Sequence, residues 1–504
     1  MSEILIIPSA AGANVANMAD CAEQAAKILG KTGSVFRKGG HVLRLVGDTL
    51  TTIKSPAAHS MIFNIMNVQK WSGRGQNVVL MPAHEIKDSV LNGILGSPFI
   101  ESHIPPVAIV VQRPFMILSD SKLITLKTGY NSERGGILVT GSQSTPEVPV
   151  AEAVESLRAL FGDFSFASPS DFSRAIAAVF VAAMRIAGIY ERHPLLVFEA
   201  DSSQAGKTLM WSMICAIFGQ RFGTVAQKRG GVGSLDESLM EKLVGGNAFI
   251  LLDNLRGPLD SAFLEACLTL ENGSIDARVA GIRAIPVDPR LVTFGLTSNG
   301  VELTIDLSNR SLLIRIRKQP GLYAFRKWTD GAGQEVDIRH HIESRQAYYQ
   351  GCVNAVLRDW WEAGAKRLPC TEHSFRETMG ALDHISHHYF GLAPLLDGHR
   401  IELERTTKPA LGWLRQIAHL AADGWGVVQW NASRLAEKCE LEGITIPGKH
   451  SDTDSAARQV GILMASAFGG AERITIDGIE VIRTTTTDEH ARERKTYSFQ
   501  LVAP

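Results

Sequence analysis

The sequence has few cysteines, and their spacing does not suggest a shared site. Six cysteines are scattered over 504 residues without a C-x-x-C motif, which argues against a disulfide framework and against a zinc site. A reduced, cytoplasmic setting is therefore expected. Long apolar runs are also missing, since none reaches the ~18 residues of a membrane-spanning helix. Because the N-terminus has no basic segment followed by a long apolar core, neither a membrane anchor nor a secretory signal is expected.

The chain also lacks an excess of charge of either sign. Lys and Arg number 51 and Asp and Glu number 52, so the formal net charge is −1. This balance argues only weakly against nucleic-acid binding, because a ring-shaped protein can confine its basic side chains to a channel. Hydrophobic residues make up 45% of the chain and charged residues 20%, as in ordinary globular proteins. The length predicts two to four domains.

The most informative stretch is residues 194–218, which read PLLVFEADSSQAGKTLMWSMICAIF. The apolar run 194–200 predicts a buried strand, residues 201–205 are small and polar like a loop, and an apolar helix pattern follows Gly206-Lys207-Thr208. A strand, a loop, Gly-Lys-Thr and a helix together are the context of a phosphate-binding P-loop. Its N–H groups and the start of the helix would face an anion.

Two residues of this stretch have specific expected roles in nucleotide binding. Lys207 can reach the β- and γ-phosphates of a nucleotide, and the Thr208 hydroxyl can bind Mg²⁺. Position 201 departs from the strict motif, because Asp201 stands where the first glycine belongs, although Asp tolerates turn geometry. The predicted nucleotide-binding residues are Asp201, Ser202, Ser203, Gln204, Ala205, Gly206, Lys207 and Thr208.

Two further predicted strands end in polar residues. Residues 248–252 are apolar and lead to Asp253, which matches the acid that holds Mg²⁺ through water beside a P-loop. The usual next residue is a Glu that activates water, but here it is Asn254. Hydrolysis then uses another base, or Asn254 only positions water, or activity is weak. The strand 291–296 leads to Thr297-Ser298-Asn299, and Asn299 is the expected γ-phosphate sensor.

Arg310 precedes a fourth apolar strand, residues 311–316. An Arg at this point can reach the nucleotide of a neighbouring subunit and stabilise transition-state charge. Because the four segments occur in this order, they support one another more than any of them does alone.

The segments ADSSQAGKT, FILLDN, GLTSN and SNRSLLIRI resemble the AAA+ ATPase of superfamily 3-type helicases. They are most similar to the helicase portions of primase–helicases carried by phages, plasmids and other mobile elements. That family often lacks the first P-loop glycine and often has Asp-Asn in place of Asp-Glu, as this chain does. The resemblance implies binding of ATP and Mg²⁺, a homo-oligomeric ring that is expected to be a hexamer, and action on single-stranded or forked DNA.

Residues 274–287 read as a hairpin placed just before the sensor strand. In the family that the chain resembles, such a hairpin projects into the ring channel and grips DNA. Arg278 and Arg283 are the basic residues that could do so here, through phosphates and without reading sequence. The alternative is that both are ordinary exposed arginines.

Several helices are predicted outside these motifs. Ser170 is expected to cap a helix over residues 171–190. An amphipathic helix over residues 259–269 would carry Asp260 and Glu265, either of which could be the missing base, although a solvated face is the simpler role. A long helix over residues 342–361 is expected to break at Gly351. Four residues have the spacing of metal ligands on one helix face, but we interpret them as a structural or surface cluster: Asp383, His384, His387 and His388.

The predicted architecture is α/β, with an AAA+ P-loop ATPase core whose parallel sheet is flanked by helices. Its parts are an α+β N-terminal domain (1–150), the ATPase domain (151–325), a helical region (326–400) and a winged-helix-like domain (401–504). Early basic residues such as Arg37 and Lys38 form either a solvated face or a phosphate-contacting surface. Residues 1–150 show no primase carboxylate pair, so any primase would be a separate partner.

The leading hypothesis is an ATP-driven, ring-forming DNA helicase acting in replication of a phage or mobile element. The alternative is an ATP-dependent DNA-binding initiator or loader that does not unwind, which Asn254 favours modestly. A nucleotide-binding scaffold without turnover is a third hypothesis. The C-terminal helices and strands fit a winged helix that binds either duplex DNA or protein.

Overall fold

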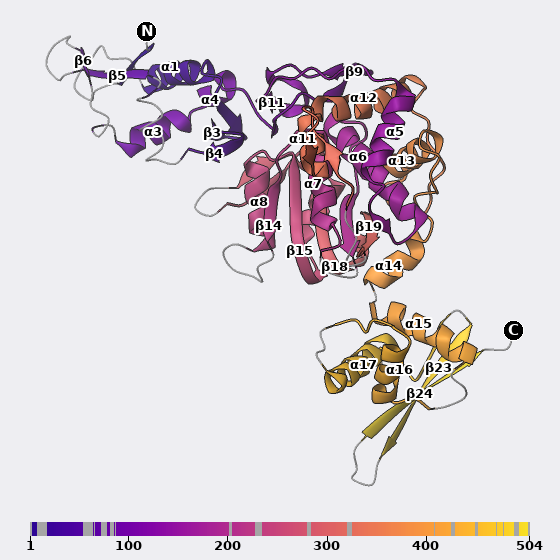
Figure 1. Cartoon of the computed structure of the whole chain (residues 1–504). Coiled ribbons are helices and arrows are strands. Elements are labelled where there is room, and N and C mark those ends of the chain that lie inside the picture. The colour runs from indigo at the N-terminus through magenta and orange to yellow at the C-terminus, as the bar shows by residue number, and fades with distance from the viewer. Residues whose placement is uncertain are drawn as a thin grey trace. The chain divides into compact units, whose positions relative to one another are not determined.

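The structure is a computed structural model, shown in Figure 1. It describes residues 3–7, 18–53, 64, 66–71, 78–80, 85, 87–200, 204–226, 234–279, 284–319, 325–407, 409–424, 429–448, 452–469, 471–476, 478–487 and 493–501. The chain divides into two compact units. The first comprises Met1–Arg256, Ser261–Asn299 and Arg310–Asp397, and the second comprises Gly257–Asp260, Gly300–Asn309 and Gly398–Pro504.

The first unit is built on a six-stranded sheet with the order β12-β19-β13-β18-β15-β14. The strands are β12 (Ser165–Phe166), β13 (Leu195–Ala200), β14 (Gly223–Ala226), β15 (Phe249–Leu259), β18 (Thr293–Leu303) and β19 (Ser311–Arg317). Strand β13 runs parallel to β18 and β19, β14 runs parallel to β15, and only the short β12 pairs in the antiparallel direction. Strands β15 and β18 are parallel too, because the hydrogen bonds between them progress in the same direction along both segments. The Thr293 N–H donates to the Ala248 carbonyl, and further along both segments the Thr297 hydroxyl donates to Asp253.

The sheet is buried in the way that parallel sheets require. All six residues of β13 are buried, which explains why five of them are apolar, since helices cover both faces of such sheets. The sixth, Glu199, lies 3.8 Å from Arg315 on β19. Helix α7 (Lys207–Ile217) packs against β13, and α6 (Pro169–Ala187) packs against β19. The predicted mixed α/β fold with a parallel sheet flanked by helices is therefore confirmed. Figure 1 shows β14, β15 and β18 side by side in this sheet.

Several predicted element ends were wrong. Helix α6 is capped by Ser168, whose side chain accepts the N–H of Asp171, and Ser170 lies inside the helix. Strand β15 continues to Leu259, so α9 (Ala262–Thr269) begins later than predicted and Asp260 is not on it. The long helix is divided at Arg345 into α11 (Ile338–Ser344) and α12 (Gln346–Glu362). It is unbroken at Gly351, where a Cβ would lie 2.6 Å from the Pro146 carbonyl oxygen, so close packing explains that glycine.

The N-terminal part of the first unit consists of short strands and helices. Its strands are β1 (Glu3–Ile7), β2 (Val35–Lys38), β3 (His41–Val46), β4 (Thr49–Thr52), β5 (Met66–Trp71), β6 (Val78–Leu80), β7 (Ile109–Val111), β8 (Met116–Ser119), β9 (Lys122–Thr125), β10 (Gly129–Asn131) and β11 (Ile137–Val139). Its helices are α1 (Met18–Gly30), α3 (Asp88–Leu95), α4 (Phe99–His103) and α5 (Val150–Leu160). A hydrophobic cluster joins α1 to its neighbours, with Cys21, Ala25 and Leu29 fully or almost fully buried.

The β2–β3 hairpin contacts helix α8 (Leu235–Val244), which lies much later in the sequence. Lys38 is only 5% exposed, and its ammonium group donates to the carbonyl oxygens of Leu243 and Val244 at 2.7 and 3.1 Å. Burial lowers the pKa of Lys38 to about 7. The expected solvated or phosphate-contacting role of Lys38 is therefore wrong, because its side chain caps the C-terminal end of α8.

The remaining elements of the first unit are short strands and α13. They are β16 (Ile275–Ala277), β17 (Ile285–Val287), β20 (Trp328–Thr329), β21 (Glu335–Val336) and α13 (Arg376–His388). Strands β16 and β17 pair in the antiparallel direction, as the predicted hairpin requires.

The second unit has its own hydrophobic core. Its elements are α10 (Ile305–Ser308), α14 (His399–Thr407), α15 (Pro409–Gly424), α16 (Ala432–Leu441), α17 (Thr453–Phe468), β22 (Arg473–Ile476), β23 (Ile479–Thr487) and β24 (Glu493–Leu501). Three helices, α15 to α17, share one core with an antiparallel three-stranded sheet. Within the described ranges, no helix is long and apolar enough to span a membrane.

Candidate functional site

Residues of the parallel strands β15 and β18 meet the start of α7, which follows β13. Gly206 is the N-cap of this helix and has φ 98°, a left-handed conformation that glycine adopts without strain. A Cβ at this position would lie 2.9 Å from the ring of Phe164, so both backbone and packing require glycine. Gln204, two residues earlier, is also left-handed, with φ 63°. The chain therefore turns sharply where the sequence predicts a phosphate-binding loop.

Four predicted site residues come together here from three elements. The Lys207 ammonium group donates to Oδ1 of Asn299 on β18. The Thr208 hydroxyl donates to Oδ1 of Asp253 on β15 at 3.3 Å. Lys207 is half-buried, while Thr208 and Asn299 are exposed. A cation, a hydroxyl, a carboxylate and an amide thus share one solvent-accessible edge of the sheet.

Sequence reasoning missed the role of Thr297. Its hydroxyl donates to Oδ1 of Asp253 at 2.6 Å and accepts the backbone N–H of Asn254 at 2.8 Å. It is only 1% exposed. Thr297 and Asn299 are two residues apart on β18 and so lie on the same face of the strand. That spacing was the available indication that Thr297 belongs with Asn299.

Asp253 and Asn254 lie inside β15 rather than after it, and Thr297 to Asn299 likewise lie inside β18. The prediction that these residues end their strands was therefore wrong, because β15 continues to Leu259 and β18 to Leu303. Asn254 has φ 52°, which is uncommon for any residue except glycine, and its side chain is exposed.

Arg310 lies immediately before β19, and its guanidinium is 3.9 Å from the carboxylate of Glu265 on α9. Both side chains are 22% exposed. Glu265, one of the two candidates for the missing base, thus has a cationic neighbour in its own chain. The other candidate, Asp260, lies between β15 and α9.

The oxygen donors at this edge fit Mg²⁺, which prefers carboxylate and hydroxyl oxygens and usually keeps several waters. Thr208 and Asp253 supply one oxygen of each kind within 3.3 Å of each other. Among the residues that the structure describes, no group of three or more His, Cys, Asp or Glu side chains is arranged to hold a metal ion. In the histidine cluster of α13, the rings of His384 and His388 stack at 5.1 Å, and burial lowers the pKa of His384.

Some predicted residues lie outside the described ranges, namely Asp201, Ser202, Ser203 and Arg283. Arg278 is described, and it is exposed directly after β16. Ala205, which lies two residues before the first residue of α7, is buried.

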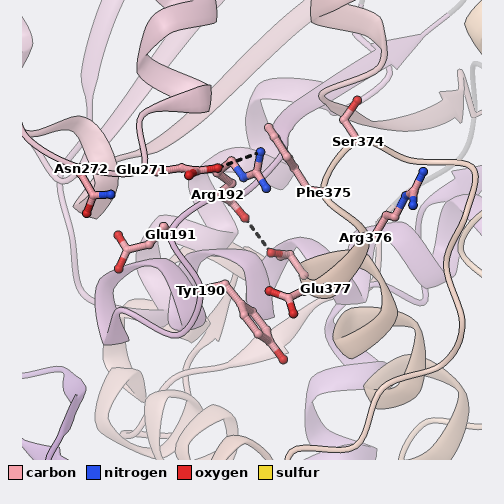
Figure 2. A pocket seen from close by; sticks show the side chains of 10 residues that line it. Tyr190, Glu191, Arg192, Glu271, Asn272, Ser374, Phe375, Arg376 and Glu377 are labelled. Carbon is pink, nitrogen blue, oxygen red and sulfur yellow. Dashed lines mark hydrogen bonds and ion pairs between the residues drawn. The ribbon is translucent and has the colours of Figure 1, made fainter.

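A separate pocket of about 510 Å³ lies away from these residues (Figure 2). It is lined by Tyr190, Glu191, Arg192, Glu271, Asn272, Ser374, Phe375, Arg376, Glu377 and Thr378. Arg192 pairs with Glu271 at 3.1 Å, as the dashed line in Figure 2 shows. Glu191 pairs with Arg290 at 3.2 Å, and Glu377 pairs with Arg367 at 2.6 Å. The three acidic residues of the pocket therefore all have basic partners.

No family model and no curated protein matches this chain. Solved structures that align with it include three apo structures of the NrS-1 C-terminal region. They are 11 or 12% identical to this chain, with TM-scores of 0.37 or 0.38, and the alignments cover 95 or 96% of this chain and 99% of each of those chains.

Proposed function

We propose that this chain is an AAA+ P-loop ATPase that uses ATP and Mg²⁺. The observation that carries the proposal is the pair of contacts at the start of α7, Lys207 with Asn299 and Thr208 with Asp253. These are the residue types that nucleotide hydrolysis needs around a phosphate, contributed by three elements that are far apart in sequence.

Each residue has a role in this proposal. Lys207 binds the β- and γ-phosphates, together with N–H groups of the loop 201–208. Thr208 and Asp253 hold Mg²⁺, directly or through water, and the ion would neutralise phosphate charge. Asn299 contacts the γ-phosphate, and its present contact with Lys207 keeps both groups at the same edge.

We propose further that the ATPase works as a homo-oligomeric ring, a hexamer, on single-stranded or forked DNA. Arg310 would complete the neighbouring subunit's site, and the hairpin with Arg278 and Arg283 would contact DNA phosphates. The exposure of Arg278 supports this role. In this proposal the protein is a cytoplasmic replicative helicase of a phage or mobile element, with a winged-helix-like second unit and any primase supplied by a separate protein.

The alternative is an ATP-dependent initiator or loader that binds DNA without unwinding it. The identity of Asn254 favours this alternative, because an amide cannot act as the general base that a Glu provides. Strand displacement on a forked duplex separates the two functions. Displacement supports the helicase, whereas ATP-dependent binding without displacement supports the switch.

The deciding experiment measures ATP hydrolysis by the full chain with and without single-stranded DNA. We expect hydrolysis that DNA stimulates, and its loss in Lys207→Ala, since the phosphates lose their cation. Lys242→Ala, on the neighbouring helix α8, is the control for removal of a lysine. Wild-type turnover by Lys207→Ala would contradict the proposed site.

A mixing experiment tests the ring. Arg310→Ala subunits added to wild-type subunits should lower the activity of the mixture below the sum of the two, because each mutant leaves a neighbour's site incomplete. Arg339→Ala is the matched control, since Arg339 is 57% exposed and pairs with Glu343 on its own helix. If the activity of the mixture with Arg310→Ala falls only in proportion to the share of wild-type subunits, action between subunits would be refuted.

A further inference from the structure

One buried hydroxyl links two adjacent residues of the candidate site. Thr297 donates its only proton to Asp253 and accepts the N–H of Asn254, at 2.6 and 2.8 Å. Because Thr297 is 1% exposed, water does not compete for either bond. The neighbouring Ser298 adds a second tie between the strands, since its hydroxyl donates to the Leu255 carbonyl at 2.9 Å.

The first consequence concerns Asp253. Its Oδ1 receives the hydroxyls of both Thr297 and Thr208, one from the buried side and one from the exposed side. The buried donor fixes the orientation of the carboxylate while the exposed side stays accessible. Groups that orient a metal-binding side chain in this way typically contribute 10- to 100-fold to metal affinity.

The second consequence concerns Asn254. Its φ of 52° is accessible to Asn far more readily than to most residues, because the short side chain tolerates the left-handed region. The bond from its N–H to Thr297 holds the backbone in that conformation. A Glu at this position would have to adopt a conformation that it disfavours.

We propose that Thr297 is a positioning residue that orients Asp253 for Mg²⁺ and holds Asn254 in a left-handed conformation. Asn stands at position 254 for its backbone conformation, which a Glu placed there would adopt only at a cost in stability. This inference rests on the proposed nucleotide site. It assigns Mg²⁺ binding to Asp253 on β15 and the orientation of that carboxylate to Thr297 on β18.

The first test measures the affinity of the full chain for a non-hydrolysable ATP analogue, with Mg²⁺ and with EDTA. Thr297→Val keeps the shape but removes both bonds. We expect it to reduce the gain in affinity that Mg²⁺ provides by 10- to 100-fold, and to change affinity in EDTA by less than about threefold. Thr297→Ser should restore the gain. An unchanged gain in Thr297→Val would overturn the role of Thr297.

The second test needs no nucleotide. Asn254→Gly should leave the unfolding equilibrium constant unchanged or more favourable to the folded state. Asn254→Glu should shift it towards unfolding by about three- to tenfold. Asn92→Glu makes the same chemical change on the exposed surface of α3, where φ is not positive, and should have little effect. Equal effects of the two Glu variants would overturn the backbone argument.

The outcomes also separate this inference from the proposed function. If the wild-type chain binds the analogue and Thr297→Val keeps the full Mg²⁺ effect, the inference fails while the ATPase proposal stands. If the wild-type chain does not bind the analogue at all, the ATPase proposal fails together with the Mg²⁺ role of Thr297. The Asn254 series still decides the conformational half in that case.

Discussion

Replacing Gly206 by Ala should destabilise the chain through two separate effects. At φ 98° a Cβ costs about 1–2 kcal/mol in backbone strain. The new methyl group would also lie 2.9 Å from one ring carbon of Phe164. That ring is 7% exposed and packs against Phe166 and Phe325, with centroids 6.2 and 5.7 Å away, so it has little room to withdraw. Overpacking of this kind costs about 1–3 kcal/mol.

The total loss expected for Gly206→Ala is therefore about 2–5 kcal/mol. Gly129→Ala is the matched control, because Gly129 has φ 95° and its Cβ would meet nothing within 4 Å. It should show the strain alone, about 1–2 kcal/mol.

Urea unfolding of the full chain measures both losses, provided that the slope with denaturant is unchanged. In a Phe164→Ala background the excess cost of Gly206→Ala should vanish, because the clashing ring is gone. Equal losses at the two glycines, with no coupling to Phe164, would refute the packing argument.

Three further predictions concern other parts of the chain. Burial lowers the pKa of His193 to about 3, so the unfolded chain binds its proton below pH 6.5 and the folded chain does not. Stability should therefore fall by about 2 kcal/mol between pH 7 and pH 5, and urea unfolding of His193→Gln should lack this component; an unchanged pH slope in the variant would contradict the assignment. Arg174→Met should cost about 3–5 kcal/mol in the same assay, because Asp171 loses its buried partner at 3.1 Å; a loss under 1 kcal/mol would argue against a buried pair. Asp452→Ala removes one half of the capping box of α17, so hydrogen exchange in the first turn of α17 should speed up by about fivefold, equivalent to ~1 kcal/mol; unchanged exchange would show that the cap does not hold that turn.

Much of the parallel sheet and its flanking helices could be predicted because the pattern is local. A fully buried strand, a short polar loop and an apolar helix each have a signature within about ten residues. The carboxyl ends of parallel strands lie at one edge of a sheet, so residues after such strands are expected to meet. This is why Lys207, Thr208, Asp253 and Asn299 could be grouped without a structure.

The remainder depends on contacts that the local sequence does not contain. The segment after Asp253 has the composition of a turn, yet β15 continues through it because β18 lies alongside. The two bonds of Thr297 depend on the register between strands more than 40 residues apart. Gly351 looked like a helix break, but the glycine is explained by the closeness of the Pro146 carbonyl.

The capping of α8 by Lys38 limits how the chain can be divided or recombined. The Leu50 N–H also donates to the Gly245 carbonyl, and the Val110 N–H donates to the Gly246 carbonyl. The first 110 residues therefore supply hydrogen-bond donors to the carbonyls at the end of α8. Helix α8 in turn packs beside β16 and β17, the hairpin that carries Arg278. A chimera that exchanges only the segment before residue 151 with one that lacks a lysine at position 38 would leave the Leu243 and Val244 carbonyls without their donor. The two stretches are therefore expected to be inherited together.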